Sequence, residues 1–260
     1  MLAAFAWLLL APVAQAAPQA ADNKPVPVPA VHFPFEGPFG DYNLPTLRRG
    51  YQIYREICAN CHGMEELSYR DLEQLGYTRQ EVRTFAKQYE VTDGPNAFGT
   101  MFQRPARPTD GFVDPFPNDQ AARVANNGSL PPDLAIIVKG REGGPAYVYA
   151  FLQGFRDPPP GFELANGTYY NSYFPGHMVA MPPMLSAGAV TFADGAPNDL
   201  ASEAYDIASF LQWAADPTLG ERHRLGRHVL LFLLVTTILL YASKRRIWGR
   251  LPPIPASQGE

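Results

Sequence analysis

The sequence predicts a mainly α-helical domain with long loops, followed by one C-terminal membrane-spanning helix. Two stretches, at 46–60 and 199–215, place apolar residues at helical spacing. Proline and glycine together make up nearly a fifth of the 260 residues, which is typical of long structured loops. A mostly apolar run at 229–242 lies between two basic segments. The sequence contains neither an internal repeat nor an alternating strand series.

The first residues form a short apolar run at 5–13, followed by Ala14-Gln15-Ala16 with small residues at alternate positions. This pattern is typical of a secretory signal peptide and its cleavage site, so we expect a signal peptide at residues 1–16. The alternative, an N-terminal membrane helix, is disfavoured by Pro12 and by the short length of the run. The proline-rich segment 17–30 is then a lead-in to the exported domain.

The first predicted helix spans 46–60. One apolar stripe is formed by Leu47, Tyr51, Tyr54 and Ile57. This stripe runs directly into the two cysteines of the chain, which are three residues apart. A disulfide-stapled scaffold is therefore excluded.

Cys58-Ala59-Asn60-Cys61-His62 matches C-x-x-C-H, the signature for attachment of c-type haem. Two thiols one turn apart can each add to one vinyl group of the porphyrin, and His62 can then bind the iron. A thioredoxin-type dithiol would need a βαβ context, whereas a helix precedes these cysteines. A zinc site would need four ligands. The remaining histidines are scattered along the chain: His32, His177, His223 and His228.

A haem that transfers electrons normally has a second axial ligand, and methionine raises its reduction potential relative to histidine. The candidates are Met64, Met101, Met178, Met181, Met184 and His177. Met64 is too close to His62 to reach the opposite haem face. Met181 is favoured because two prolines follow it and stiffen its loop. Its neighbours and His177 remain open on the chemistry alone.

Turn dipeptides such as Asp93-Gly94 and Asp110-Gly111 dominate the region 90–200, where only 118–127 and 145–154 indicate helices. The second strongly periodic helix ends at Ala215, before Asp216-Pro217. Asn198 or Asp199 can cap its start.

The apolar run 229–242 is shorter than the ~20 residues that usually span a bilayer, so a buried core helix is the alternative. Arginines before it and Lys244-Arg245-Arg246 with Trp248 after it favour a transmembrane helix at about 225–246. The signal peptide would export residues 17–224. It would leave a proline-rich tail, 247–260, extended in the cytoplasm.

The formal charge of −4 is unevenly distributed. Residues 221–260 carry +5 and residues 1–220 carry −9. This acidic main domain argues against a nucleic-acid partner. It favours a basic protein partner that is attracted over long range.

Four segments and the C-terminal anchor resemble the cytochrome c1 family, the haem subunit of the quinol–cytochrome c reductase (respiratory complex III), in its bacterial type. The resemblance covers about residues 31–250. The segments, in family order, are 49–57 (RGYQIYREI), 122–134 (ARVANNGSLPPDL), 173–176 (YFPG) and 210–217 (FLQWAADP). It implies a cytochrome c-like domain of mainly α structure whose large loops wrap the haem.

The resemblance also implies roles for particular residues. Met181 would be the axial ligand opposite His62, and Arg123 would lie near a haem propionate, which a guanidinium binds well. From its chemistry alone, Arg123 would instead form a surface ion pair. The segment 127–132 would be a loop at the haem edge. Some bacterial members brace the methionine loop with an extra cysteine pair, and because this chain has none, other packing must hold the loop.

The expected function is that of a one-electron relay with one covalently bound haem c, which is not an enzyme on its own. It would take electrons from a Rieske iron–sulfur protein and pass them to a soluble cytochrome c, while a cytochrome b partner performs the quinol chemistry. The expected location is the bacterial inner membrane, with a single span, a periplasmic haem domain and a cytoplasmic C-terminus.

Two other functions remain open at this level. The first is a membrane-anchored cytochrome c that donates electrons to an oxidase or a photosynthetic reaction centre. The second, of a different class, is a haem enzyme or gas sensor with an open iron position, which would bind carbon monoxide when reduced.

Overall fold

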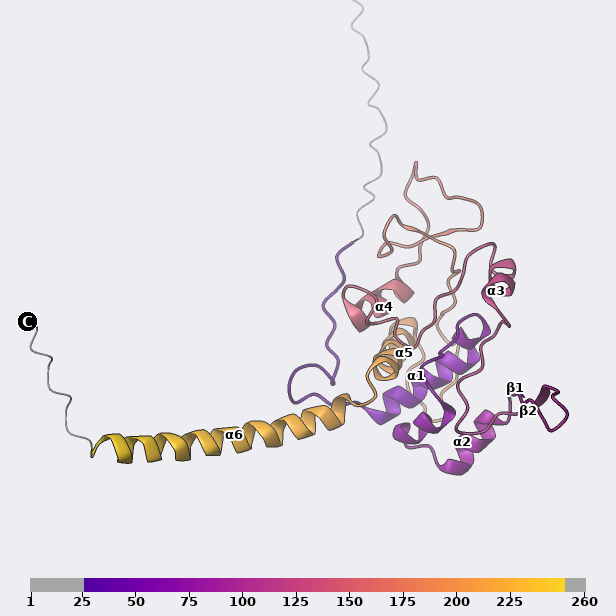
Figure 1. Cartoon of the computed structure of the whole chain (residues 1–260). Helices are drawn as coiled ribbons and strands as arrows, with labels where there is room; N and C mark the ends of the chain where they lie inside the picture. Colours follow the sequence, from indigo (N-terminus) through magenta and orange to yellow (C-terminus); the bar gives the residue numbers. More distant parts are fainter. Residues whose placement is uncertain (1–25, 251–260) are drawn as a thin grey trace, which may run out of the picture.

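The computed structural model describes residues 26–250. The predicted signal peptide at 1–16 and residues 251–260 of the predicted tail lie outside this range. The described chain is mainly helical, with few strands and long loops, as the sequence predicted. A single long helix extends away from the haem-motif domain (Figure 1).

Helix α1 (Leu44–Glu56) leads into the cysteine motif. Asn43 caps it by accepting a hydrogen bond from the Thr46 amide at 3.2 Å. The prediction of one continuous helix over 46–60 was wrong at its end, because Ile57 leaves helical geometry (φ −120°, ψ −60°). A separate 3₁₀ turn, η1 (Cys58–Asn60), follows.

Helix α5 (Leu200–Ala215) forms where the sequence predicted it, and Asp199 is the cap. Its carboxylate accepts from the amides of Ala201 and Ser202 at 3.0 and 3.1 Å. The same helix packs against both α1 and α4 and is almost entirely buried. It is therefore the central element of the domain.

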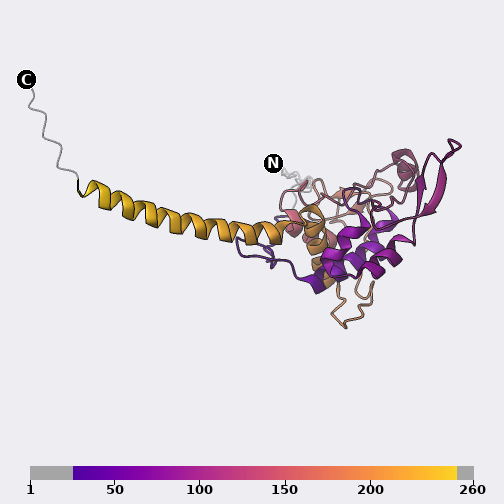
Figure 2. The ribbon, with the colours of Figure 1, turned by 60° about the horizontal axis from the view of Figure 1, so that its bottom comes forward.

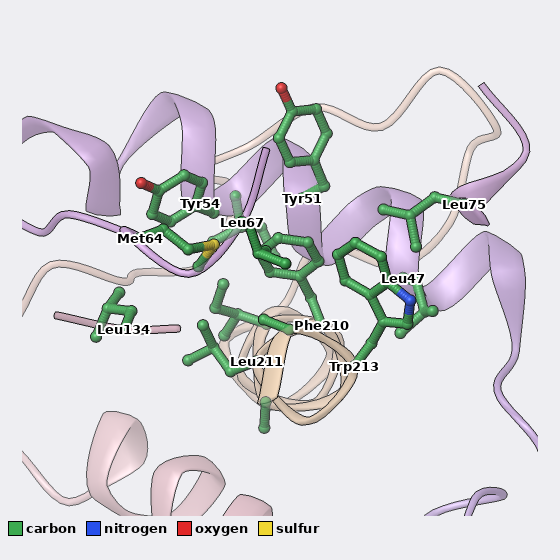
Figure 3. Packing of buried hydrophobic residues seen from close by; sticks show 14 of the residues in the cluster. Leu47, Tyr51, Tyr54, Met64, Leu67, Leu75, Leu134, Phe210, Leu211 and Trp213 are labelled. Carbon is green, nitrogen blue, oxygen red and sulfur yellow. The ribbon is translucent and has the colours of Figure 1, made fainter. Parts of the chain in front are cut away.

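The core lies mainly between α1 and α5. Figure 3 shows α5 nearly end-on, with Phe210 and Trp213 directed toward α1. Both side chains are at most 2% exposed, and Phe210 lies 5.8 Å from the Tyr51 ring and 6.0 Å from the Tyr54 ring, centroid to centroid. The predicted apolar stripe of α1 thus faces α5, and it fixes the orientation of the helix that ends at the cysteines.

The two weaker helix predictions are confirmed with shifted ends as α3 (Asp119–Ala125) and α4 (Gly144–Gln153). Two further helices were not predicted: η2 (Tyr69–Leu75) and α2 (Arg79–Ala86). Both begin with a capping box, Ser68 with Asp71 and Thr78 with Glu81. The capping signal was therefore present in the sequence, but each helix is too short for a convincing apolar period.

Two small antiparallel hairpins occur in the loop-rich region. Strand β1 (Glu90–Asp93) pairs with β2 (Phe102–Pro105), and this hairpin projects from the body of the domain (Figure 2). Strand β3 (Tyr169–Tyr170) pairs with β4 (Met178–Val179) and precedes the methionine loop. The strands have only two to four residues, which is too short for an alternating pattern to predict them.

Helix α6 (Leu219–Trp248) has 30 residues, so it is about 45 Å long. It is the one helix in the described chain that is long and apolar enough to cross a membrane, and its apolar window is not covered by the domain. The predicted span 225–246 lies within it. The helix continues through Trp248, so the expectation of an extended tail from 247 was wrong for its first residues.

The N-terminal end of α6, its root, is held to the domain by hydrogen bonds and an ion pair. The Tyr42 hydroxyl donates to the Asp216 carbonyl oxygen at 2.9 Å, and His223 Nδ1 lies 2.8 Å from the carbonyl oxygen of Gly40. Arg222 adds an ion pair with Asp216 at 2.6 Å. The anchor therefore leaves the domain in a defined direction.

Candidate haem site

The two cysteines lie on the short turn that follows α1. The amides of Cys61 and His62 donate to the carbonyl oxygen of Cys58 at 3.1 and 3.0 Å. The Asn60 side chain donates to the carbonyl oxygen of Ile57 at 3.0 Å and so satisfies the end of the helix. These bonds bring both thiols and the imidazole onto one turn, as the C-x-x-C-H spacing requires.

Burial raises the pKa of the Cys58 thiol to about 12, and the neighbouring Cys61 contributes to the rise. A thiol with so high a pKa is a poor thiolate nucleophile, unlike the activated cysteine of a redox dithiol. Within residues 26–250, no three His, Cys, Asp or Glu side chains come together in a way that could hold a metal ion. The raised pKa of Cys58 therefore does not favour a redox dithiol.

His62 Nδ1 lies 2.7 Å from the carbonyl oxygen of Pro132. A carbonyl oxygen can only accept, so Nδ1 carries the proton and donates it. The Nε2 lone pair is then available to bind a metal, and the bond orients the ring. Burial also lowers the pKa of His62, which favours the neutral form that ligation needs.

The segment that supplies Pro132 is pinned to the cysteine motif at further points. The Leu134 amide donates to the Gly63 carbonyl oxygen at 3.0 Å, and the Glu65 amide donates to the Asp133 carboxylate at 2.8 Å. The family resemblance implied a loop at the haem edge for 127–132, but the sequence did not identify the Pro132 carbonyl as the partner of His62. A backbone acceptor leaves no side-chain signal in a sequence.

Arg123 lies in the last turn of α3, the helix before the same loop. Its side chain is exposed, and Nη1 donates to the Gly128 carbonyl oxygen at 3.3 Å. Asn127 takes a left-handed conformation in this loop (φ 51°). Arg123 forms no ion pair with any residue that the structure describes, so the alternative role as a surface ion-pair partner finds no support.

The candidates for the second axial ligand differ in burial. Met64 is fully buried in the core, among the packed apolar side chains that Figure 3 shows. Met101 is 55% exposed, and Met178 and Met184 are 41% and 39% exposed. Met181 lies between the latter two, half-buried on a bend after β4 and before Pro182. This intermediate position is suited to a side chain that faces a prosthetic group.

His177, the remaining candidate, is 3% exposed, and its Nδ1 lies 3.0 Å from the carbonyl oxygen of Asn171. Its ring stacks on Tyr170 at a centroid distance of 5.2 Å. These contacts hold the imidazole inside the β3–β4 turn. His177 is therefore held by contacts within the protein, whereas Met181 lies half-buried on a bend.

The comparisons with known proteins agree with the geometry. Residues 33–251 match the model of the Cytochrome C1 family. The chain belongs to the cytochrome c1 family. It is 46% identical over 224 residues to cytochrome c1 1, heme protein, mitochondrial, of Arabidopsis thaliana, which covers 86% of this chain and 73% of that protein. It is 41% identical over 230 residues to cytochrome c1 of Rhodospirillum rubrum, covering 82% of this chain and 85% of that one.

A third relative is longer. Cytochrome b/c1 of Bradyrhizobium diazoefficiens is 41% identical over 270 residues, which cover 95% of this chain but only 39% of that protein. The chain therefore spans well under half of this relative. Membership of the cytochrome c1 family implies that the chain binds haem c and is an electron-transfer subunit of complex III, a role that is not enzymatic on its own.

The residues present fit haem c. Two thiols and an imidazole with a free Nε2 lie on one turn, and a half-buried thioether is available from a separate loop. When bound, haem c supplies an iron that changes its charge by one electron. Cys58 and Cys61 would provide the attachment points, and the Pro132 carbonyl orients the ring of His62, which would be the proximal ligand.

Carboxylates gather beside the histidine. The pKa of Glu65 is raised by Asp114 and Asp133, and that of Asp114 is raised by burial and by Asp133. Such mutual repulsion means that the three groups share one negative surface. This acidic group, defined as Glu65, Asp114 and Asp133, adjoins the cysteine motif through the Glu65–Asp133 bond.

Proposed function

We propose that the chain carries one haem c bound covalently through Cys58 and Cys61, with His62 and Met181 as its axial ligands. In this arrangement the chain relays single electrons from a Rieske iron–sulfur protein to a soluble cytochrome c. Arg123 would pair with a haem propionate. The observation that carries the proposal is the bond from His62 Nδ1 to the Pro132 carbonyl oxygen, because it leaves Nε2 free for iron.

The proposed location is the bacterial inner membrane, in a complex with cytochrome b. Helix α6 would cross the bilayer once, with the haem domain in the periplasm and the C-terminus in the cytoplasm. The basic residues at both ends of the helix support an anchor with its ends at the headgroups. The rigid root of α6 would keep the haem domain at a fixed height above the membrane, so that a mobile donor must come to it.

The test of the ligand set is a redox titration of the purified complex carrying Met181→Leu. We expect a lower reduction potential, loss of the sulfur-to-iron absorption band and binding of carbon monoxide to the reduced protein. Met178→Leu, on β4, and Met184→Leu, on the loop after it, are matched controls, and they should leave all three properties unchanged. A native potential in Met181→Leu would show that another residue is the ligand.

The acidic group supports a basic soluble acceptor, because like charges next to the haem site attract a cationic partner at long range. We expect reduction of a basic cytochrome c to slow as salt rises, and Glu65→Gln to weaken this salt dependence. Glu73→Gln is the control, because Glu73 lies on η2, which Arg48 ties to the opposite end of α1. A rate that is indifferent to ionic strength would contradict electrostatic steering.

Co-purification separates this function from its alternative. A chain that serves complex III should be isolated with cytochrome b and a Rieske protein. A chain that donates directly to an oxidase or a reaction centre should be isolated without them.

A further inference from the structure

The loop that carries Met181 is not held by a disulfide, because the two cysteines of the chain belong to the haem motif. Met181 lies two residues after β4, and Pro182 and Pro183 follow it. Its position therefore depends on what fixes the β3–β4 hairpin. The contacts of that hairpin converge on one residue, His177.

His177 closes the hairpin turn through three hydrogen bonds. Its amide donates to the Phe174 carbonyl oxygen at 2.8 Å, and its carbonyl oxygen accepts from the Asn171 amide at 2.9 Å. Its Nδ1 donates to the Asn171 carbonyl oxygen at 3.0 Å. The ring also packs against Tyr170, at 5.2 Å, and lies 6.3 Å from Phe162, centroid to centroid. The side chain thus ties the two ends of the turn together.

The backbone of His177 is in the left-handed region, with φ at 61°. This conformation is uncommon for residues other than glycine, although asparagine, aspartate and histidine adopt it more often than other side chains do. Glycine would adopt it without strain, yet the position holds a large buried imidazole. A strained residue persists where its surroundings require its side chain, which points to a role for the imidazole itself.

The turn is also fastened to the body of the domain. The Asn171 side chain donates to the Phe151 carbonyl oxygen at 2.8 Å, and the Ser172 amide donates to the Gly154 carbonyl oxygen at 3.0 Å. Both acceptors lie at the end of α4. Because α4 packs on α5 and α5 packs on α1, a continuous set of contacts connects the hairpin to the helix that ends at the cysteines.

Gly154 allows the hairpin to lie this close to the end of α4. A Cβ at Gly154 would lie 2.5 Å from Asn171 Oδ1 and 2.7 Å from Tyr173 Cδ2. An alanine there would push the hairpin away from α4 through Asn171 and Tyr173. This offers a second, independent way to disturb the same support.

We propose that His177 is a positioning residue that holds Met181 at the haem iron by closing the Asn171–His177 turn. The inference rests on the proposed function, because it assumes that Met181 is the ligand. His177 itself does not touch the iron in this arrangement. Its contribution is to keep the methionine loop in one conformation, so that the thioether remains bound in both oxidation states.

The experiment compares His177→Gly with His177→Asn in the purified, haem-loaded complex. Both residues tolerate a positive φ, but only asparagine keeps an N–H group at the place of Nδ1. We expect His177→Gly to lower the reduction potential and weaken the sulfur-to-iron absorption band. The fraction of reduced protein that binds carbon monoxide should rise about tenfold, as the loss of one buried hydrogen bond and a ring contact predicts. His177→Asn should restore most of the band and the potential, and Gly154→Ala should resemble His177→Gly.

Covalent haem content and thermal unfolding monitor general damage. Val82→Ala is a matched control, because Val82 is fully buried on α2 and is remote in sequence from the hairpin. It should lower the unfolding temperature and leave the iron–sulfur band unchanged. Equal loss of the band in His177→Gly and His177→Asn would overturn the role of the Nδ1 hydrogen bond.

The outcome also separates this inference from the proposed function. If Met181→Leu removes the band while His177→Gly retains the band, the potential and the resistance to carbon monoxide, the positioning role is wrong and the ligand stands. If Met181→Leu retains the band, the ligand assignment fails and the positioning role fails with it.

Discussion

Arg49 on α1 binds Asp206 on α5 through two guanidinium nitrogens, with Nε 2.6 Å from one carboxylate oxygen and Nη2 3.1 Å from the other. The Asp206 side chain is only 5% exposed, and Arg49 Nη1 also contacts Asp194 at 2.9 Å. Burial raises the pKa of Asp206, and the bonds from Arg49 oppose this rise. The pair joins the helix that leads into the haem motif to the helix that packs on it.

Replacement of Arg49 by methionine should leave a buried, unpaired carboxylate and destabilise the domain by about 3–5 kcal/mol at neutral pH. Without Arg49 the folded-state pKa of Asp206 rises further above its unfolded value. The cost therefore appears as pH rises through the folded-state pKa and diminishes as pH falls below it. Urea unfolding across this pH range tests the prediction. The double variant Arg49→Met, Asp206→Asn should recover much of the loss, and a pH-independent loss would contradict the mechanism.

The close crossing of α1 and α5 depends on Gly50. A Cβ at this position would lie 2.5 Å from the Phe210 Cβ and would overlap the carbonyl oxygen of Asp206. We expect Gly50→Ala to destabilise the domain by about 1–3 kcal/mol or more, because the helices must separate. Gly226→Ala, on α6, is the control. Nothing lies within 4 Å of its added Cβ, so the unfolding temperature should be unchanged or slightly higher.

Asp133 follows Pro132, whose carbonyl oxygen binds His62. Its carboxylate accepts a hydrogen bond from the Glu65 amide and places a negative charge beside the cysteine motif. Asp133→Asn should raise the reduction potential, since a nearby negative charge stabilises the oxidised iron. Asp133→Ala should raise the potential further. It also removes the carboxylate that accepts from the Glu65 amide and so loosens the loop that holds the Pro132 carbonyl. Potentiometric titration measures both variants. Glu66→Gln serves as a control for charge alone, and a larger shift there than in Asp133→Ala would argue against the loop contribution.

Glu203 is fully buried near the start of α5. Its Oε1 accepts from the Val190 amide at 3.1 Å, whereas its Oε2 has no hydrogen-bond partner among the described residues. Burial raises the pKa of this carboxyl above the ordinary 4.5. Its ionisation therefore costs stability as pH rises through the folded-state pKa, and not below about 4.5, where both states are protonated.

Glu203→Gln should keep the acceptor for Val190 and remove the ionisable group. We expect it to stabilise the domain by about 1 kcal/mol near neutral pH, and to have little effect below the ordinary pKa of glutamate. Thermal unfolding of the variant and the parent at both pH values measures the difference. A stabilisation that is equal at the two pH values would show that ionisation of Glu203 is not its cause.

The sequence by itself determined the cofactor chemistry and the main helices of this protein. The spacing of Cys58, Cys61 and His62 is a local property, since one turn of chain places them together. The stripe of α1 and the cap and apolar face of α5 are local in the same sense. The acidic domain and the apolar C-terminal run follow from composition alone.

The tertiary structure decided which partners complete these local elements. The acceptor for His62 is a backbone carbonyl seventy residues away, and the support of the Met181 loop comes from the end of α4. Backbone acceptors and two-residue strands leave no periodic trace in a sequence, because their position depends on contacts between distant segments. The burial that raises the pKa of Cys58 and lowers that of His62 arises in the same way, from packing that only the folded chain provides.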